Sequence, residues 1–171
     1  MTYIGGPTAL IEVAGLRLLT DPTFDPPGKR FRLTQKLQGP AIGAPATGHI
    51  DAVLLSHDQH PDNLDDAGRA ALQGAALVLT TPAGAQRLGG KAIGLRPWQT
   101  HVLQTRSGRA VRVTAVPARH GPEGFEGRTG DVTGFVVASG TEGEPVLYIS
   151  GDTVFFEGVA EVGRRFRVGT A

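Results

Sequence analysis

Three observations predict an α+β fold for this chain of 171 residues. Its first twenty residues alternate apolar and polar side chains about a tight turn, residues 51–88 alternate strand with helix patterns, and residues 100–150 carry strand patterns alone. A chain of this length buries roughly 70% of its unfolded surface on folding. We therefore expect a single domain over residues 1–171.

The amino-terminal segment predicts a β-hairpin. TALIEV and GLRLLTD alternate apolar and polar residues on either side of Ala14-Gly15, a pair suited to a tight turn. Residues 22–49 are rich in proline, glycine and basic residues and show little periodicity. They predict a long loop over one face of the domain.

Two strand-helix units follow the loop. Asp51–Ser56 is an apolar run typical of a buried strand, and Asp62–Gln73 places its apolar residues at helical spacing. Leu77–Thr80 predicts the next strand, and Ala83–Leu88 a short helix that Gly89-Gly90 ends. The second half predicts a meander of strands over four segments: Thr100–Gln104, Ala110–Val116, Val132–Ala138 and Pro145–Ser150.

Composition narrows the chemistry and the partners. The chain contains no cysteine, so disulfides and thiolate ligands are excluded, and a metal site must use imidazole, carboxylate or amide groups. Seventeen basic and sixteen acidic residues leave a net charge of +1, with no basic run interleaved with aromatics. We expect no nucleic-acid partner. Without a leader or an apolar run of about 18 residues, we expect a cytoplasmic protein outside the membrane that acts on a small molecule.

Metal-capable side chains crowd the segment SHDQHPDNLD, directly after a predicted buried strand. His57, Asp58, His60 and Asp62 offer imidazole and carboxylate ligands suited to Zn²⁺, Mn²⁺ or Fe²⁺. The other interpretation is helix capping, with Asp62 as the N-cap and Asp65 in the capping-box position. Both interpretations fit this segment when it is taken alone.

Two further strand ends carry candidate ligands. His120 follows AVPAR and opens a glycine-rich loop, although a lone loop histidine is commonly a surface residue. Asp152 follows VLYIS, with Gly151 leaving room for close backbone approach, although an aspartate there commonly forms an Asx turn. Three such clusters at the ends of strands favour a metal site.

The segments IGGPTALIEVAGLRLLTDPTFD, AVLLSHDQHPDNLD, VTAVPARHG and LYISGDT together resemble the metallo-β-lactamase superfamily. Within it, they are similar to the hydrolases related to ascorbate-6-phosphate lactonase. The resemblance covers nearly the whole chain and implies a four-layer αββα sandwich. In such a sandwich, helices cover two central sheets and one or two metals lie at the sheet edge.

The family motif HxHxDH is altered in this chain. Aligned without a gap, Asp58 takes the place of the first histidine, whereas a bulge of one residue puts His57 there. The last histidine of the motif is replaced by Asn63. The ligands that the resemblance implies are His57 or Asp58, His60, Asp62, Asn63, His120 and Asp152.

The end of the chain also departs from the family pattern. The family's final histidine lies on a strand well after GDT, whereas this sequence ends at RRFRVGTA. We therefore expect the C-terminal strand and helix of the family to be missing, and the open sheet edge to favour association into oligomers.

The resemblance implies a metal-dependent hydrolase in which metal-activated water attacks a lactone, an ester or a phosphodiester. His60 and Asp62 are the catalytic residues that it implies, with Asp62 accepting a proton from the water. The competing hypothesis is a non-catalytic member of the fold, with a degraded metal site, that serves as a binding or scaffold module.

Overall fold

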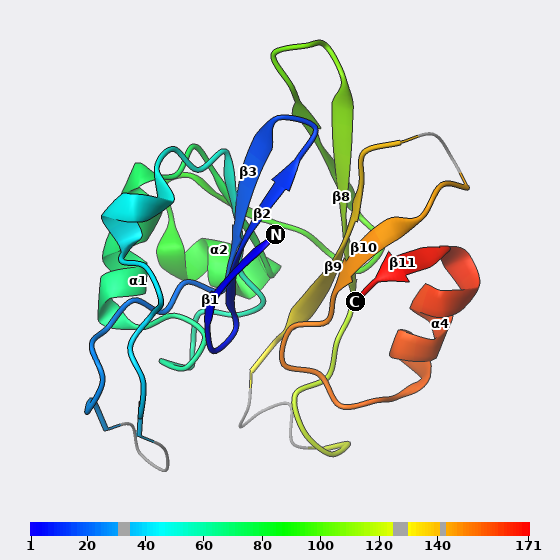
Figure 1. Ribbon diagram of the computed structural model, residues 1–171. Coiled ribbons are helices and arrows are strands. Elements are labelled where there is room, and N and C mark those ends of the chain that lie inside the picture. Colours follow the sequence, from blue (N-terminus) through cyan, green and yellow to red (C-terminus); the bar gives the residue numbers. More distant parts are fainter. Residues whose placement is uncertain (31–34, 125–129, 141–142) are drawn as a thin grey trace.

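The computed structural model describes residues 1–30, 35–124, 130–140 and 143–171. Two β-sheets lie in the middle of the molecule, with α1 and α2 on the outer side of one sheet and α4 on the outer side of the other (Figure 1). This arrangement is the αββα sandwich, and it confirms the predicted α+β class. The glycine-rich loop after His120 and the long loop after Pro22 lie partly outside the described residues.

The first sheet has six strands in the order β1-β2-β3-β4-β5-β6. Strands β1, β2 and β3 pair antiparallel, and β3 to β6 pair parallel. The predicted hairpin is confirmed, because Ala14 and Gly15 form its turn with φ of 49° and 84°. The strands are β1 (Thr2–Gly5), β2 (Thr8–Val13), β3 (Leu16–Thr20), β4 (Ala52–Leu54), β5 (Val78–Thr80) and β6 (Ala92–Gly94).

The second sheet has five strands in the order β11-β10-β9-β8-β7. The predicted meander is confirmed, because β7 to β10 pair antiparallel with their neighbours, while β11 joins β10 in parallel. The strands are β7 (Thr100–Gln104), β8 (Ala110–Pro117), β9 (Thr133–Ala138), β10 (Val146–Ile149) and β11 (Val168–Thr170).

The helices are short: α1 (Asp66–Ala71), α2 (Pro82–Leu88) and α4 (Glu157–Arg165), with 3₁₀ turns η1 (Ala44–Thr47) and η2 (Leu72–Gly74). Ala67 and Ala71 of α1 and Leu88 of α2 pack on the outer face of the first sheet. Val162 of α4 packs against Val136 and Tyr148 on the outer face of the second. None of the helices in the described part of the chain has the length and apolar content that a membrane span requires.

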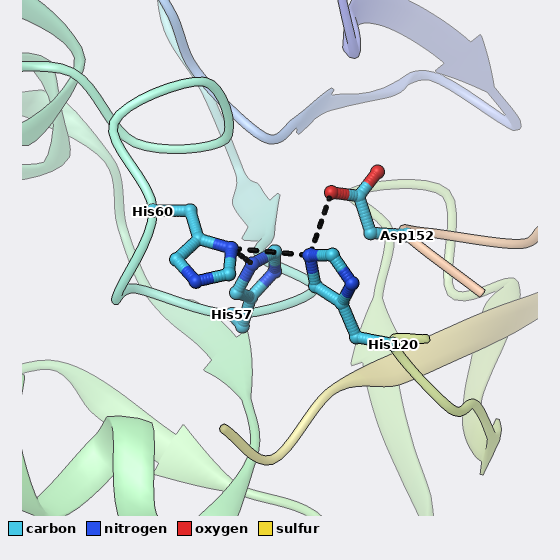
Figure 2. Close-up of side chains that lie close together, drawn as sticks. All are labelled: His57, His60, His120 and Asp152. Carbon is cyan, nitrogen blue, oxygen red and sulfur yellow. Dashed lines mark hydrogen bonds and ion pairs between the residues drawn. The ribbon is translucent and has the colours of Figure 1, made fainter. Parts of the chain in front are cut away.

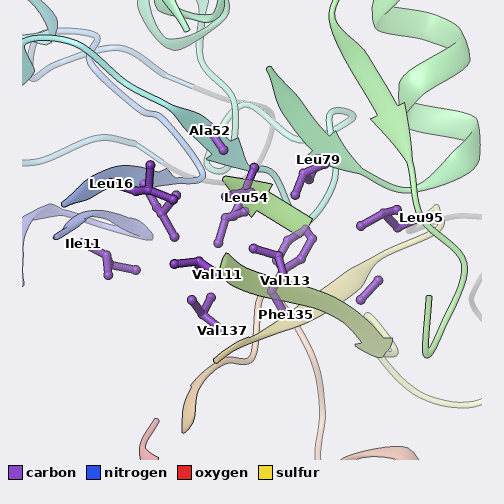
Figure 3. Packing of buried hydrophobic residues seen from close by; sticks show 13 residues of the cluster. Ile11, Leu16, Ala52, Leu54, Leu79, Leu95, Val111, Val113, Phe135 and Val137 are labelled. Carbon is purple, nitrogen blue, oxygen red and sulfur yellow. The ribbon is translucent and has the colours of Figure 1, made fainter. Parts of the chain in front are cut away.

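The main core fills the space between the two sheets. Leu54 and Leu79 of the first sheet face Val113 and Phe135 of the second, and all four side chains are fully buried or nearly so (Figure 3). A strand that is buried on both faces has apolar residues at consecutive positions. This burial explains the continuous apolar sequences of β4 and β5. This close-packed core fixes the position of one sheet relative to the other. It therefore also fixes the distances between residues at their strand ends.

One expectation about the elements is wrong. The helix after the histidine-rich segment begins at Asp66, not at Asp62, because the side chain of Asp65 accepts the backbone N–H of Gly68 and is the N-cap. After β10 the chain forms α4 and then β11. There, the backbone N–H of Val146 donates to the carbonyl of Arg167 at 2.9 Å.

Candidate metal centre

The candidate ligands come together because three strands end at the same edge of the sandwich. His57 follows β4, His120 follows β8 and Asp152 follows β10. The backbone N–H of Thr133, at the start of β9, donates to the carbonyl of Ser56 at 3.0 Å and links the two sheets beside the site. The chain after β4 is therefore held against the second sheet.

The loops after β8 and β10 also bind each other. The backbone N–H of Arg119 donates to Oγ1 of Thr153 at 2.9 Å, and the N–H of Val154 donates to the carbonyl of Arg119 at 2.9 Å. These bonds flank His120 and Asp152 on both loops. They place the imidazole of His120 next to the carboxylate of Asp152.

Four side chains form one compact cluster: His57, His60, His120 and Asp152 (Figure 2). Nε2 of His57 lies 3.0 Å from Nδ1 of His60, and Nε2 of His120 lies 3.1 Å from the same Nδ1. Oδ2 of Asp152 lies 3.4 Å from Nε2 of His120, and all four ligand atoms lie within 4.8 Å of one another. Ligand atoms around a tetrahedral zinc ion lie roughly 3.3–3.4 Å apart, so the cluster has the dimensions of a metal site.

The contacts among the imidazoles also fit a cation. A neutral imidazole carries one N–H, so Nδ1 of His60 is either a donor or an acceptor. If Nδ1 of His60 carries the proton, it donates to only one of its two neighbours. If it does not, its single lone pair in the ring plane would have to accept from both. One of the two close contacts therefore lacks a straight hydrogen bond. A cation in the centre would accept all three nitrogen lone pairs at once.

His57 is the most enclosed of these ligands. Its side chain is fully buried, and burial lowers its pKa to about 4, with the electrostatic effect of the neighbouring His60 and His120 adding to the decrease. The imidazole is therefore neutral at ordinary pH, which is the form that binds metals. Oγ of Ser56 lies 3.0 Å from Nδ1 of His57 and orients the ring so that Nε2 faces the cluster.

Asp58 lies outside the cluster. Its carboxylate is buried and bonded to Arg87 of α2, with Nη2 at 2.6 Å from Oδ1 and Nε at 2.9 Å from Oδ2. Nη2 of Arg69 also donates to the backbone carbonyl of Asp58 at 3.0 Å. Of the two alternatives for the first ligand, His57 lies in the cluster, whereas Asp58 is paired with Arg87.

Asp62 and Asn63 also lie outside the group of four. Asp62 is exposed in the turn before α1, where its negative charge raises the pKa of His57 slightly against the effect of burial. Asn63 is buried, and its Nδ2 donates to Oγ of Ser56 at 3.3 Å. The structure thus places Asn63 behind His57 as a hydrogen-bond partner of Ser56.

Asp21 is a buried carboxyl group directly after β3, and the sequence analysis did not include it among the site residues. Its Oδ1 accepts the backbone N–H of Ser56 at 2.6 Å. Burial raises the pKa of Asp21 to about 7, and the negative charge of Asp152 adds to the increase. A sequence analysis could have included Asp21 in the site by predicting that β3 pairs with β4 in parallel, because this pairing puts the carboxyl ends of the two strands side by side.

Gly151 allows the close approach of Asp152 to the chain after β4. It has φ of 63°, and a Cβ placed on it would lie 2.8 Å from Cβ of Ser56 and 2.9 Å from the carbonyl of Thr133. Any side chain at this position would push the β10 loop away from β4. The close backbone approach predicted at Gly151 is therefore confirmed.

Most of the chain matches a known protein-family model. The family model described as the beta-lactamase superfamily domain matches residues 16–168. Uncharacterized proteins of Mycobacterium tuberculosis and Mycobacterium bovis are 29% identical to this chain over 178 aligned positions. The alignment covers 95% of this chain and 44% of each relative, so the chain spans less than half the length of these curated relatives.

Solved structures share the fold at low sequence identity. An isothiocyanate hydrolase from Delia radicum gut bacteria superposes with a TM-score of 0.76 at 22% identity, over 98% of this chain and 68% of the other. A possible metal-dependent hydrolase from Veillonella parvula gives 0.74 at 18% identity, over 96% and 67%. A metallo hydrolase from Ignicoccus hospitalis gives 0.65 at 21% identity, over 96% and 65%.

Proposed function

Since the chain belongs to the beta-lactamase superfamily, as the match over residues 16–168 shows, we propose that it is a metal-dependent hydrolase. The observation that carries the proposal is the convergence of three imidazoles and one carboxylate on a single point. Nitrogen and oxygen donors of this kind suit zinc, and also manganese or iron. We propose zinc as the resident ion, held by His57, His60, His120 and Asp152.

Zinc bound by these residues would supply a water molecule with a pKa lowered to about 7. The residues of the chain would orient and deprotonate that water. Asp62 is exposed beside the cluster and forms no ion pair within the described residues, so its carboxylate is free to accept a proton. Ser56 holds His57, and the Asp58–Arg87 pair holds the loop that carries His60.

Lactones, esters and phosphodiesters are the substrate classes that we propose. Lactones come first, because the four segments that resemble the superfamily are, taken together, similar to the hydrolases related to ascorbate-6-phosphate lactonase. The structural similarity to an isothiocyanate hydrolase adds an isothiocyanate to the compounds worth testing. In each case water adds to an electrophilic carbon or phosphorus atom.

One observation favours the alternative of a non-catalytic member. Asn63 replaces the last histidine of the family motif, and its amide is directed to Ser56, not to the cluster. A second metal position would lose that ligand. A binding or scaffold module on this fold would retain the four-residue cluster without turnover.

Metal analysis and hydrolysis assays separate the two functions. We expect the protein purified without added metal to contain about one zinc ion per chain and to hydrolyse at least one lactone, ester, phosphodiester or isothiocyanate. His120→Ala should lose both the ion and the activity. A wild-type protein that takes up no metal and hydrolyses none of these compounds after zinc addition would contradict the hydrolase proposal.

A further inference from the structure

A cavity of about 740 Å³ has Asp62, two residues after His60, in its wall. Its walls are β1, the loop segment 35–41 and the turn that contains Pro61 and Asp62. The backbone N–H of Ala41 donates to the carbonyl of Ile4 at 2.7 Å, so the loop is bound to the edge of β1 and the cavity is preformed. Its volume lies in the range of small-molecule binding sites.

Shared wall residues link this cavity to a second one that reaches the candidate ligands. A second cavity of about 520 Å³ shares Gly6, Pro7 and Asp62 with the first and extends to Asp152. Asp62 thus faces both spaces, and Asp152 belongs to the cluster itself. A molecule lying along the first cavity would place one end near the candidate ligands.

The walls of the large cavity are mainly apolar. Tyr3 and Leu37 line it and are 68% and 82% exposed, an unfavourable position for large apolar side chains unless a ligand covers them. The cation of Lys36 is already engaged, because its Nζ lies 3.2 Å from Oδ2 of Asp65 and 3.1 Å from the carbonyl of Thr23. Among the described residues that line the cavity, Asp62 is the charged group without an ion-pair partner, and its carboxylate would repel an anion.

We propose that this cavity binds the apolar body of an uncharged ester or lactone, and that the chain therefore discriminates against phosphodiesters and other anions. The inference rests on the proposed hydrolase function and names its substrate class. Water adds to the carbonyl carbon, the acyl–oxygen bond breaks, and an acid and an alcohol (or one hydroxy acid from a lactone) are released. The reaction requires no other reactant.

Three nitrophenyl substrates test the inference with the zinc-loaded 171-residue protein: p-nitrophenyl acetate, p-nitrophenyl hexanoate and bis(p-nitrophenyl) phosphate. We expect kcat/KM for the hexanoate to exceed that for the acetate at least about tenfold, because additional methylenes enter an apolar pocket. The phosphodiester should be the poorest substrate. Leu37→Asp should abolish the preference for the hexanoate, mainly through KM.

Val102→Asp is the matched control, because Val102 is also an exposed apolar residue but lies on β7, outside this cavity. It should keep the preference of the wild type. Equal kcat/KM for the two esters, an unchanged preference in Leu37→Asp, or faster turnover of the phosphodiester would overturn the inference while leaving the hydrolase proposal intact.

Binding of a neutral apolar dye, N-phenyl-1-naphthylamine, tests the cavity without turnover. The wild type and Val102→Asp should bind the dye with equal affinity, and both Leu37→Asp and Tyr3→Asp should bind it at least about tenfold more weakly. If no ester is hydrolysed but the dye shows this pattern, the hydrolase proposal fails and the apolar binding site remains. Equal binding by all four proteins would show that the cavity is not the site.

Discussion

The ion pair between Asp58 and Arg87 should control both the stability of the chain and its affinity for metal. Asp58 lies between two candidate ligands, and its carboxylate is only 5% exposed, whereas the Arg87 side chain is 42% exposed. Removing one partner of a fully buried pair costs about 3–5 kcal/mol. Because water already reaches Arg87, we expect Arg87→Met to lower the free energy of unfolding by about 2 kcal/mol.

The same substitution should weaken metal binding. The unpaired carboxylate of Asp58 would move toward water and pull on the loop that holds His57 and His60. Loss of a group that orients metal ligands typically lowers metal affinity about 10- to 100-fold. Urea denaturation of the metal-free protein measures the first effect, and competition with a zinc chelator measures the second.

Arg164→Met is the matched control, because Arg164 pairs with Glu157 and Glu161 on the exposed surface of α4. It should change stability little and leave zinc affinity unchanged, because water screens an exposed ion pair. The double variant Asp58→Asn/Arg87→Met should recover part of the lost stability, since no buried charge remains unpaired. If Arg87→Met costs no more than Arg164→Met and binds zinc as the wild type does, the positioning role of this pair is refuted.

Three further predictions concern other parts of the site. Zinc at about 100 times its Kd should raise the free energy of unfolding by about 2.7 kcal/mol, and His120→Ala should remove this increase in urea denaturation. Burial raises the pKa of Asp21 to about 7, so the folded metal-free chain holds a proton that the unfolded chain releases near pH 4. The contribution of Asp21 to stability should therefore fall by about 4 kcal/mol between pH 4 and pH 7, while the lowered pKa of His57 adds stability over much of the same range. In a pH series of denaturation curves, the difference between the wild type and Asp21→Asn should show the Asp21 slope alone. Gly151→Ala should displace Asp152 and weaken zinc binding, whereas Gly143→Ala, which has positive φ but open space around it, should only reduce stability by about 1–2 kcal/mol; equal zinc affinity in the two variants would argue against the close-approach explanation.

Features that depend on neighbouring residues could be predicted from the sequence. The apolar alternation around Ala14-Gly15 determines the hairpin, and the short apolar runs determine the buried strands of both sheets. The positions of His57, His120 and Asp152 directly after strands also follow from the sequence. Residues at the ends of strands in a layered sandwich meet at one edge, and this geometry is why the candidate cluster was accessible to sequence reasoning.

The choice between His57 and Asp58 was made only by the tertiary structure. Both lie in the same loop and both offer metal-binding atoms, so local sequence does not distinguish them. The difference comes from Arg87, 29 residues away on α2, which binds the carboxylate of Asp58 and turns it from the cluster. An ion pair over such a separation depends on how α2 packs beside the loop.

The start of α1 was decided in the same way. Asp62 and Asp65 are both good N-cap residues, but the carboxylate of Asp65 also accepts the backbone N–H groups of Phe24 and Asp25 in the long loop. Those donors are about forty positions away, and burying them without a partner would cost free energy. Local propensity permits either Asp62 or Asp65 as the N-cap. The hydrogen bonds that the folded loop requires make Asp65 the N-cap.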